Sequence, residues 1–131
     1  MTVARRVMLV EDNEDHRLLI RAALAALRVD LVSFASAEAA LAGSPKEFDL
    51  ILADVRLAGM SGIEFAGHCS PLGVPVVMLS TSEDPEDIAA CLQAGAAGYV
   101  TKATGIEALR SKLSEVLATF VGEHKPPTQN R

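Results

Sequence analysis

The sequence predicts a single α/β domain, a doubly wound parallel sheet of five strands with helices on both faces. Two observations carry this prediction: short apolar runs alternate with longer helical patterns, and several runs end in acidic or hydroxyl residues. The 131 residues suffice for one hydrophobic core but not for two. Because 50% of the residues are hydrophobic and 22% are charged, disorder is excluded as the dominant state.

The predicted strands are apolar on both faces, as strands in a covered parallel sheet are. They comprise residues 5–10, 31–35, 49–53, 74–79 and 98–101. The helices between them show apolar residues at helical spacing or end at a glycine, and comprise residues 14–27, 37–42, 63–69, 85–94 and 106–121. Asp84 before Pro85 is typical of a helix start. The third helix is brief, so we expect its face to be partly irregular.

Charge and cysteine content exclude several classes of protein. Twelve basic and seventeen acidic residues give a net charge of -5, which disfavours binding to nucleic acid or to a membrane surface. Cys69 and Cys91 form no CxxC motif, which favours a reducing, cytoplasmic location. No segment has the length and apolarity of a signal peptide or a membrane span. A zinc site is not expected, because no ligand spacing relates the three histidines, His16, His68 and His124.

Polar side chains end or follow four of the predicted strands, at the edge where a doubly wound sheet places its ligand site. They are Glu11 and Asp12, Asp54, Ser80 to Ser82, and Thr101 with Lys102. At ~5 Å and an effective dielectric constant of ~20, each pair of carboxylates costs roughly 3 kcal/mol. Lys102 supplies one positive charge against three negative ones. The sequence therefore predicts a divalent cation that prefers oxygen ligands, and Mg²⁺ fits such a site.

A cation beside an accessible aspartate favours phosphoryl chemistry. An oxygen of Asp54 can attack a phosphorus atom in line and form an acyl phosphate, while Lys102 and the Ser80 hydroxyl bind phosphoryl oxygens. Each residue alone has a simpler explanation: Asp12 or Asn13 as the cap of the first helix, Asp54 as a polar strand end. The phosphoryl site is the better interpretation because five positions coincide on one edge in order.

Four segments resemble the receiver domains of bacterial two-component response regulators, of the chemotaxis Y protein type: VMLVEDN, DLILADVRLAGMSG, PVVMLSTS and AGAAGYVTK. The resemblance extends over residues 5–121, with the motifs in the right order and at the right spacings. It implies a flavodoxin-like, CheY-like fold with strand order 2-1-3-4-5. It also implies a receiver domain over residues 1–122, and we expect residues 123–131 to be a flexible tail.

The resemblance also implies roles for individual residues. The Mg²⁺ ligands would be Glu11, Asp12, Asp54 and the backbone carbonyl of Arg56. Asp54 would accept the phosphoryl group, with Lys102 contacting it, Ser80 as the switch hydroxyl and Tyr99 as the aromatic side chain that follows inward. Gly62 matches the glycine that closes the loop after the acceptor.

Several positions depart from the family pattern. Arg56 brings a cation beside the acceptor, where we expect it to alter the phosphoryl lifetime and to form an ion pair with Glu83, Asp84 or Glu11. Thr81 is expected to narrow access to the phosphoryl group. Ala103 stands where the family has proline, so the Lys102–Ala103 peptide bond is expected to be trans.

The predicted function is a phosphorylation-activated signalling switch. A sensor histidine kinase or a histidine phosphotransfer protein would phosphorylate Asp54, and the surface of the fourth helix, fifth strand and fifth helix would then control a downstream protein. The chain would not be an enzyme, apart from self-phosphorylation and autodephosphorylation. We expect no direct contact with nucleic acid or membrane, and either a monomer or a phosphorylation-dependent dimer.

Several alternatives stay open at this stage. The sequence could be the receiver part of a larger regulator or hybrid kinase, or an unphosphorylated docking module. An aspartate-nucleophile phosphatase needs a second acid two residues after Asp54, where Arg56 stands. A flavodoxin-like electron carrier needs a hydroxyl-rich phosphate loop and aromatic residues around the flavin, and the sequence offers neither.

Overall fold

The computed structural model describes residues 5–102 and 105–121, which contain one parallel five-stranded sheet in the order β2-β1-β3-β4-β5. Both the predicted class and the predicted strand order are thereby confirmed. The strands are β1 (Arg5–Val10), β2 (Val29–Phe34), β3 (Leu50–Asp54), β4 (Val76–Ser80) and β5 (Gly98–Thr101). Three of them differ from the predicted bounds by one or two residues at each end.

The five helices occur where the sequence predicts them: α1 (Glu14–Leu24), α2 (Ala37–Ala42), α3 (Gly62–Cys69), α4 (Pro85–Gln93) and α5 (Ile106–Val116). The predicted first helix is too long at its C-terminal end. It stops at Leu24 because the chain then turns towards β2 through Arg28, whose φ of 54° is left-handed. The predicted fifth helix has the right extent, but its last part, Leu117–Val121, is a π-helical turn.

Two features of the helices agree with the sequence pattern. Asp84 caps α4, and its carboxylate accepts a hydrogen bond from the backbone N–H of Glu86 at 2.9 Å. The third helix is brief, as predicted, and a 3₁₀ turn, Ser70–Leu72, follows it. The expectations for the Lys102–Ala103 peptide bond, for a domain end at residue 122 and for a tail at residues 123–131 lie outside the described residues.

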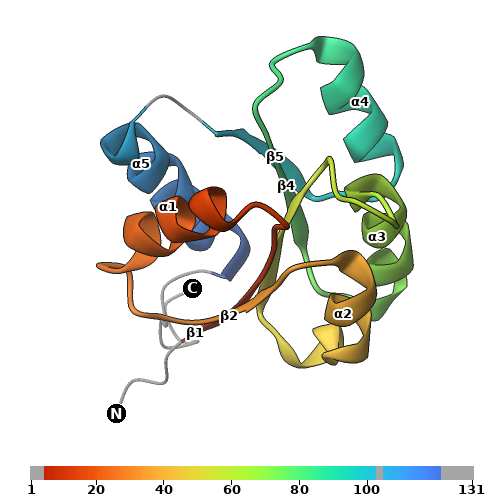
Figure 1. Cartoon of the computed structure of the whole chain (residues 1–131), viewed down its shortest axis with the longest axis horizontal. Helices are drawn as coiled ribbons and strands as arrows, with labels where there is room; N and C mark the ends of the chain where they lie inside the picture. Colours follow the sequence, from red (N-terminus) through yellow and green to blue (C-terminus); the bar gives the residue numbers. More distant parts are fainter. Residues whose placement is uncertain (1–4, 103–104, 122–131) are drawn as a thin grey trace, which may run out of the picture.

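Helices cover both faces of the sheet, with α1 and α5 on one face and α2, α3 and α4 on the other (Figure 1). Side chains of each strand alternate between the two layers, as the pleat requires. In β1, Val7 and Leu9 pack in the core under α1 and α5, whereas Met8 and Val10 pack in the core under α2 and α3. Among the described helices, none is long and apolar enough to cross a membrane.

Candidate functional site

The alternation of the strands decides which face each polar residue at the sheet edge joins. In β3, Leu50 and Leu52 face the α1 and α5 layer, so Asp54 comes next on that side. The same alternation applies to β1 and β5. Glu11 follows Leu9 on the α1 and α5 face, and Lys102 follows Val100 on that face. Ser80 continues the opposite row of β4, after Val76 and Met78, and therefore belongs to the α3 and α4 side.

Lys102 follows β5, and its ammonium group lies at the centre of the acidic residues. Its Nζ atom donates to Glu11 Oε1 at 2.6 Å and to Asp54 Oδ2 at 3.1 Å, and it lies 2.9 Å from Nδ1 of His16. The lysine side chain is only 4% exposed. The backbone N–H of Lys102 donates to the carbonyl of Ser80 at 2.6 Å, which fixes the chain where it leaves the sheet.

Glu11 is fully buried, and burial dominates its ionisation. Loss of water raises the pKa of Glu11 to about 7, although its hydrogen bond and ion pair with Lys102 act in the opposite direction. Its other carboxylate oxygen accepts from the backbone N–H of Asn13 at 3.3 Å, and its backbone carbonyl accepts from Arg17 at 2.8 Å. A negative charge in this position would gain from a further positive charge nearby.

Asp54 is the last residue of β3 and is largely buried, with 8% of its surface exposed. Its Oδ1 atom accepts from the backbone N–H of Arg56 at 3.2 Å. Gly62 closes the following loop, and its N–H donates to the carbonyl of Val55 at 3.0 Å. A Cβ atom on Gly62 would collide with the backbone carbonyl of Asp54, so this close approach requires glycine.

A pocket of about 220 Å³ opens at this edge, and most of the predicted site residues line it. They are Glu11, Asp12, Asp54, Arg56, Ser80, Thr81 and Lys102, joined by Asn13 and His16. Asp12 is exposed and accepts a hydrogen bond from the backbone N–H of Ala58 at 3.0 Å. Asn13, rather than Asp12, caps α1 and accepts from the backbone N–H of His16. The Asp12 carboxylate is therefore not needed for helix capping.

Ser80 belongs to a chain of hydrogen bonds that runs away from the acidic residues towards α4. Its hydroxyl accepts from the backbone N–H of Ser82 at 3.0 Å. The Ser82 hydroxyl in turn donates to Asp87 Oδ2 on α4 at 2.7 Å, and the Ser82 carbonyl accepts from the Tyr99 hydroxyl at 2.7 Å. Tyr99 is half-buried and packs against the core below α3 and α4. A displacement of this loop would therefore affect both Tyr99 and α4.

Arg56 and Thr81 lie exposed on the rim of the pocket. The predicted ion pair of Arg56 with Glu83, Asp84 or Glu11 is wrong, since Arg56 forms no ion pair within residues 5–102 and 105–121. Glu11 is not available because it already pairs with Lys102. An ion pair of Arg56 with Glu83 or Asp84 on the surface would gain little, because ordering two long side chains costs entropy.

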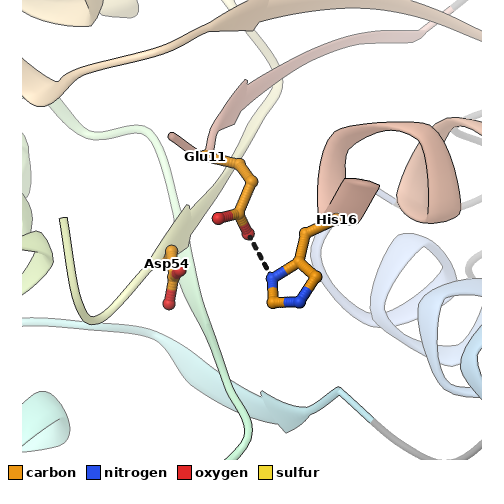
Figure 2. Close-up of side chains that lie close together, drawn as sticks. All are labelled: Glu11, His16 and Asp54. Carbon is orange, nitrogen blue, oxygen red and sulfur yellow. Dashed lines mark ion pairs between the residues drawn. The ribbon is translucent and has the colours of Figure 1, made fainter. Parts of the chain in front are cut away.

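His16 is the residue that the sequence pattern did not reveal. It lies in the first turn of α1, and its Nδ1 atom is 3.8 Å from Glu11 Oε1, the pair marked by the dashed line in Figure 2. Ligand atoms of Glu11, His16 and Asp54 lie within 4.8 Å of one another. The spacing of the histidines from each other carried no signal. The signal that could have indicated His16 is its position, about one helical turn after Glu11 and Asp12 and therefore at the same edge of the sheet.

The donor set fits a hard divalent cation. Carboxylates of Glu11, Asp12 and Asp54 line one open pocket, and the Lys102 ammonium already lies between two of them. Burial raises the pKa of Glu11, and a divalent cation bound beside it would favour its ionised form. Oxygen ligands with room for water are what Mg²⁺ or Mn²⁺ accepts.

Comparison with known proteins assigns the family. The sequence pattern of the response regulator receiver domain family matches residues 7–114, which is most of the chain. The chain therefore belongs to this family of two-component signalling switches, whose members bind a divalent metal ion and receive their signal from kinase or phosphotransfer partners.

Individual relatives agree with this assignment. The chain is 37% identical over 124 residues to the two-component response regulator ORR41 of Oryza sativa subsp. japonica, covering 88% of this chain and 93% of the relative. It spans only 26% of the length of the transcriptional regulatory protein ZraR of Salmonella typhimurium, to which it is 30% identical.

Two solved structures extend the comparison to three dimensions. The phosphorylated cyanobacterial phytochrome response regulator RcpA superimposes with a TM-score of 0.80 at 25% identity, covering 95% of this chain and 99% of that one. The Mn²⁺-bound response regulator Rcp1 superimposes with a TM-score of 0.74 at 25% identity, covering 93% and 97%. Both confirm the CheY-like receiver fold expected from the sequence.

Proposed function

We propose that the protein is a phosphorylation-activated switch of a two-component phosphorelay, with Asp54 as the phosphoryl acceptor. One observation carries the proposal: Asp54 lines an open pocket, and the Lys102 ammonium lies 3.1 Å from Asp54 Oδ2. A nucleophilic oxygen and a positive charge for the incoming phosphoryl group are thus adjacent. The phosphorylated form of RcpA, a receiver of the same fold, supports the assignment.

The proposed reaction moves one phosphoryl group from a histidine to Asp54. A carboxylate oxygen of Asp54 attacks the phosphorus atom, the P–N bond to the donor imidazole breaks, and its electron pair stays on the imidazole nitrogen. Lys102 then shifts its hydrogen bond from the carboxylate to a phosphoryl oxygen. The donor would be a sensor histidine kinase or a histidine phosphotransfer protein.

Mg²⁺ is the proposed cofactor. The residues that would hold it are Glu11, Asp12, Asp54 and the backbone carbonyl of Arg56. When bound, the ion neutralises charge on the acids and on the phosphoryl group. Asp12 would have to exchange its present hydrogen bond to the Ala58 N–H for the ion, which is a small cost for an exposed side chain.

The proposed switch runs from Ser80 to the α4-β5-α5 surface. The Ser80 hydroxyl would donate to a phosphoryl oxygen, which alters its contact with the Ser82 N–H and so the loop that Tyr99 and Asp87 both hold. A pocket of about 320 Å³ between β5 and the C-terminal helical segment is bordered by Tyr99 and Phe120. We propose that a downstream protein contacts the α4-β5-α5 surface, which includes this pocket.

The remaining proposals concern modulation and context. Arg56 and Thr81, on the rim, would slow hydrolysis by crowding the attacking water. The chain would catalyse only its own phosphorylation and dephosphorylation, in the cytoplasm, as a monomer or as a dimer formed on phosphorylation. It would act either alone or as the receiver part of a larger regulator, because ORR41 matches along most of its length and ZraR along a quarter.

The test is the intact mass of the protein after incubation with acetyl phosphate, with and without Mg²⁺. The wild type is expected to gain one phosphoryl group only with Mg²⁺, as an acid-stable and base-labile adduct, and Asp54→Asn is expected to gain none. Asp15→Asn, which removes an exposed carboxylate on α1, is the matched control and should be labelled like the wild type. An adduct that persists in Asp54→Asn would reject Asp54 as the acceptor. No adduct in the wild type would also reject it, and would favour an unphosphorylated docking module.

A further inference from the structure

His16 stands beside the proposed acceptor without a role in the function described so far. It lies in the first turn of α1, where Asn13 holds its backbone N–H, and its side chain is 37% exposed. Its ring points towards Glu11 and Asp54 (Figure 2), and its Nδ1 atom is 2.9 Å from Lys102 Nζ. This contact joins α1 to the end of β5.

The chemistry of the contact allows only one arrangement. An ammonium group has three N–H donors and no acceptor, so the Nδ1 atom of His16 must be the acceptor and the ring proton must be on Nε2. Glu11 and Asp54 accept the other two N–H groups, at 2.6 and 3.1 Å. All three donors of Lys102 are therefore used, and His16 is the neutral acceptor among the three.

We propose that His16 is a positioning residue, which holds the Lys102 ammonium where a phosphoryl oxygen on Asp54 will meet it. This inference rests on the proposed function. Glu11 alone would draw Nζ towards itself, since their contact is the shortest of the three. His16 balances that pull from the α1 side. When Asp54 is phosphorylated and its hydrogen bond to Lys102 shifts to the phosphoryl group, two anchors remain instead of one.

A role of His16 as a metal ligand is the competing interpretation, because a ring nitrogen of His16 lies within 4.8 Å of carboxylate oxygens of Glu11 and Asp54. The position of Lys102 argues against it, since the ammonium already occupies the lone pair of Nδ1. The two interpretations differ in what loss of the imidazole changes. A positioning residue affects the rate of phosphorylation and the state of Lys102, whereas a ligand affects metal affinity.

The test uses three substitutions in the full chain. His16→Leu removes the acceptor, His16→Asn keeps a carbonyl oxygen near the place of Nδ1, and His68→Leu makes the same change at an exposed site on α3. For each, we would measure the phosphorylation rate constant with acetyl phosphate at saturating Mg²⁺, the Kd of Mg²⁺ and of Mn²⁺ by calorimetry, and the ¹H–¹⁵N signal of the Lys102 ammonium by NMR.

His16→Leu is expected to phosphorylate about tenfold more slowly, which corresponds to one lost hydrogen bond to a charged group. The Kd of both metals should stay within about twofold of the wild type, a change below one hydrogen bond. The Lys102 ammonium signal should shift or broaden. His16→Asn should recover most of the rate, and His68→Leu should match the wild type.

Three results would overturn the proposal: an unchanged rate in His16→Leu, a parallel loss of Mn²⁺ affinity and rate, or no rescue by His16→Asn. Failure of the proposed function is distinguishable, because the wild type would then take up no phosphoryl group at all. The NMR signal of the Lys102 ammonium then still tests the contact between Lys102 and His16. An identical signal in His16→Leu and the wild type would reject that contact.

Discussion

The two faces of the sheet carry different parts of the site. On the α1 and α5 face, Glu11, Asp54 and Lys102 form a charged cluster that is almost completely buried, and the His16 ring lies beside it. On the α3 and α4 face, Ser80, Ser82, Tyr99 and Asp87 form a hydroxyl network that is mostly half-buried. The pleat separates the residues of the two groups that lie in or directly after strands, since neighbours along a strand point to opposite faces. Under the proposed function, the chemistry and its transmission therefore occupy opposite layers.

The two groups should also differ in energetic cost when one member is removed. Deleting one partner of a buried ion pair leaves an uncompensated charge, which costs several kcal/mol. Deleting one neutral hydrogen bond near the surface costs about 1 kcal/mol. The charged cluster should therefore dominate stability, and the hydroxyl network should be easy to rearrange.

The largest effect is expected from Lys102→Met, which keeps the apolar stem and removes the charge. At about pH 8 the variant should lose about 3 to 5 kcal/mol of unfolding free energy, because Glu11 and Asp54 lose their shared counter-charge. Urea denaturation measures this loss. Arg110→Met, which removes a cation whose partner Glu107 is exposed, is the control and should cost less than about 1 kcal/mol. A similar loss of unfolding free energy in Lys102→Met and Arg110→Met would contradict the dominant role of the charged cluster in stability.

Glu11→Gln should reveal the raised pKa of Glu11. Burial raises that pKa from 4.5 to about 7, so between these values the folded protein binds more protons than the unfolded chain. The unfolding free energy therefore falls as pH rises through this range. Glutamine has no such proton, so the stability of the wild type relative to Glu11→Gln should decrease by about 2 to 3 kcal/mol between about pH 5 and pH 8.

Urea denaturation of both proteins over this pH range measures the difference. Parallel stability curves would show that Glu11 ionises normally in the fold. Millimolar Mg²⁺ should flatten the wild-type curve, because an ion bound to the carboxylate favours its ionised form.

The sequence was sufficient for the fold because the relevant signals are local. Continuous apolar runs identified buried strands, and Asp84 before Pro85 identified the start of α4. Helix ends were less predictable: the apolar pattern of α1 continues to Leu27, but the backbone turns at Arg28. Tertiary packing of Leu27 beside the core does not require it to be helical.

The site was only partly predictable for a similar reason. The residues that follow strand ends converge because parallel strands end at one edge, and this places Glu11, Asp54 and Lys102 together. His16 and Arg56 depend instead on where long side chains point. His16 turns inward from a helix onto Lys102, whereas Arg56 extends outward without an ion pair among the described residues.

The smallest effect is expected from Ser82→Ala in the hydroxyl network. This variant loses the hydrogen bond to Asp87 and the one that Asp84 N–H donates to Ser82 Oγ, but it keeps the backbone carbonyl that binds Tyr99. The unfolding free energy should fall by about 1 kcal/mol. Amide exchange in α4 should become faster, because its first turn loses a tie to the loop. Thr81→Ala, an exposed neighbour, is the control for both measurements.

Combining Ser82→Ala with Lys102→Met tests whether the two layers are independent before phosphorylation. The two side chains lie on opposite faces and share no side-chain hydrogen bond among the described residues. Their effects on the unfolding free energy should then add to within about 0.5 kcal/mol. A larger coupling would mean that the backbone hydrogen bond from Lys102 to Ser80 already joins the charged cluster to the hydroxyl network. In that case the separation of chemistry from transmission would not hold even in the unphosphorylated protein.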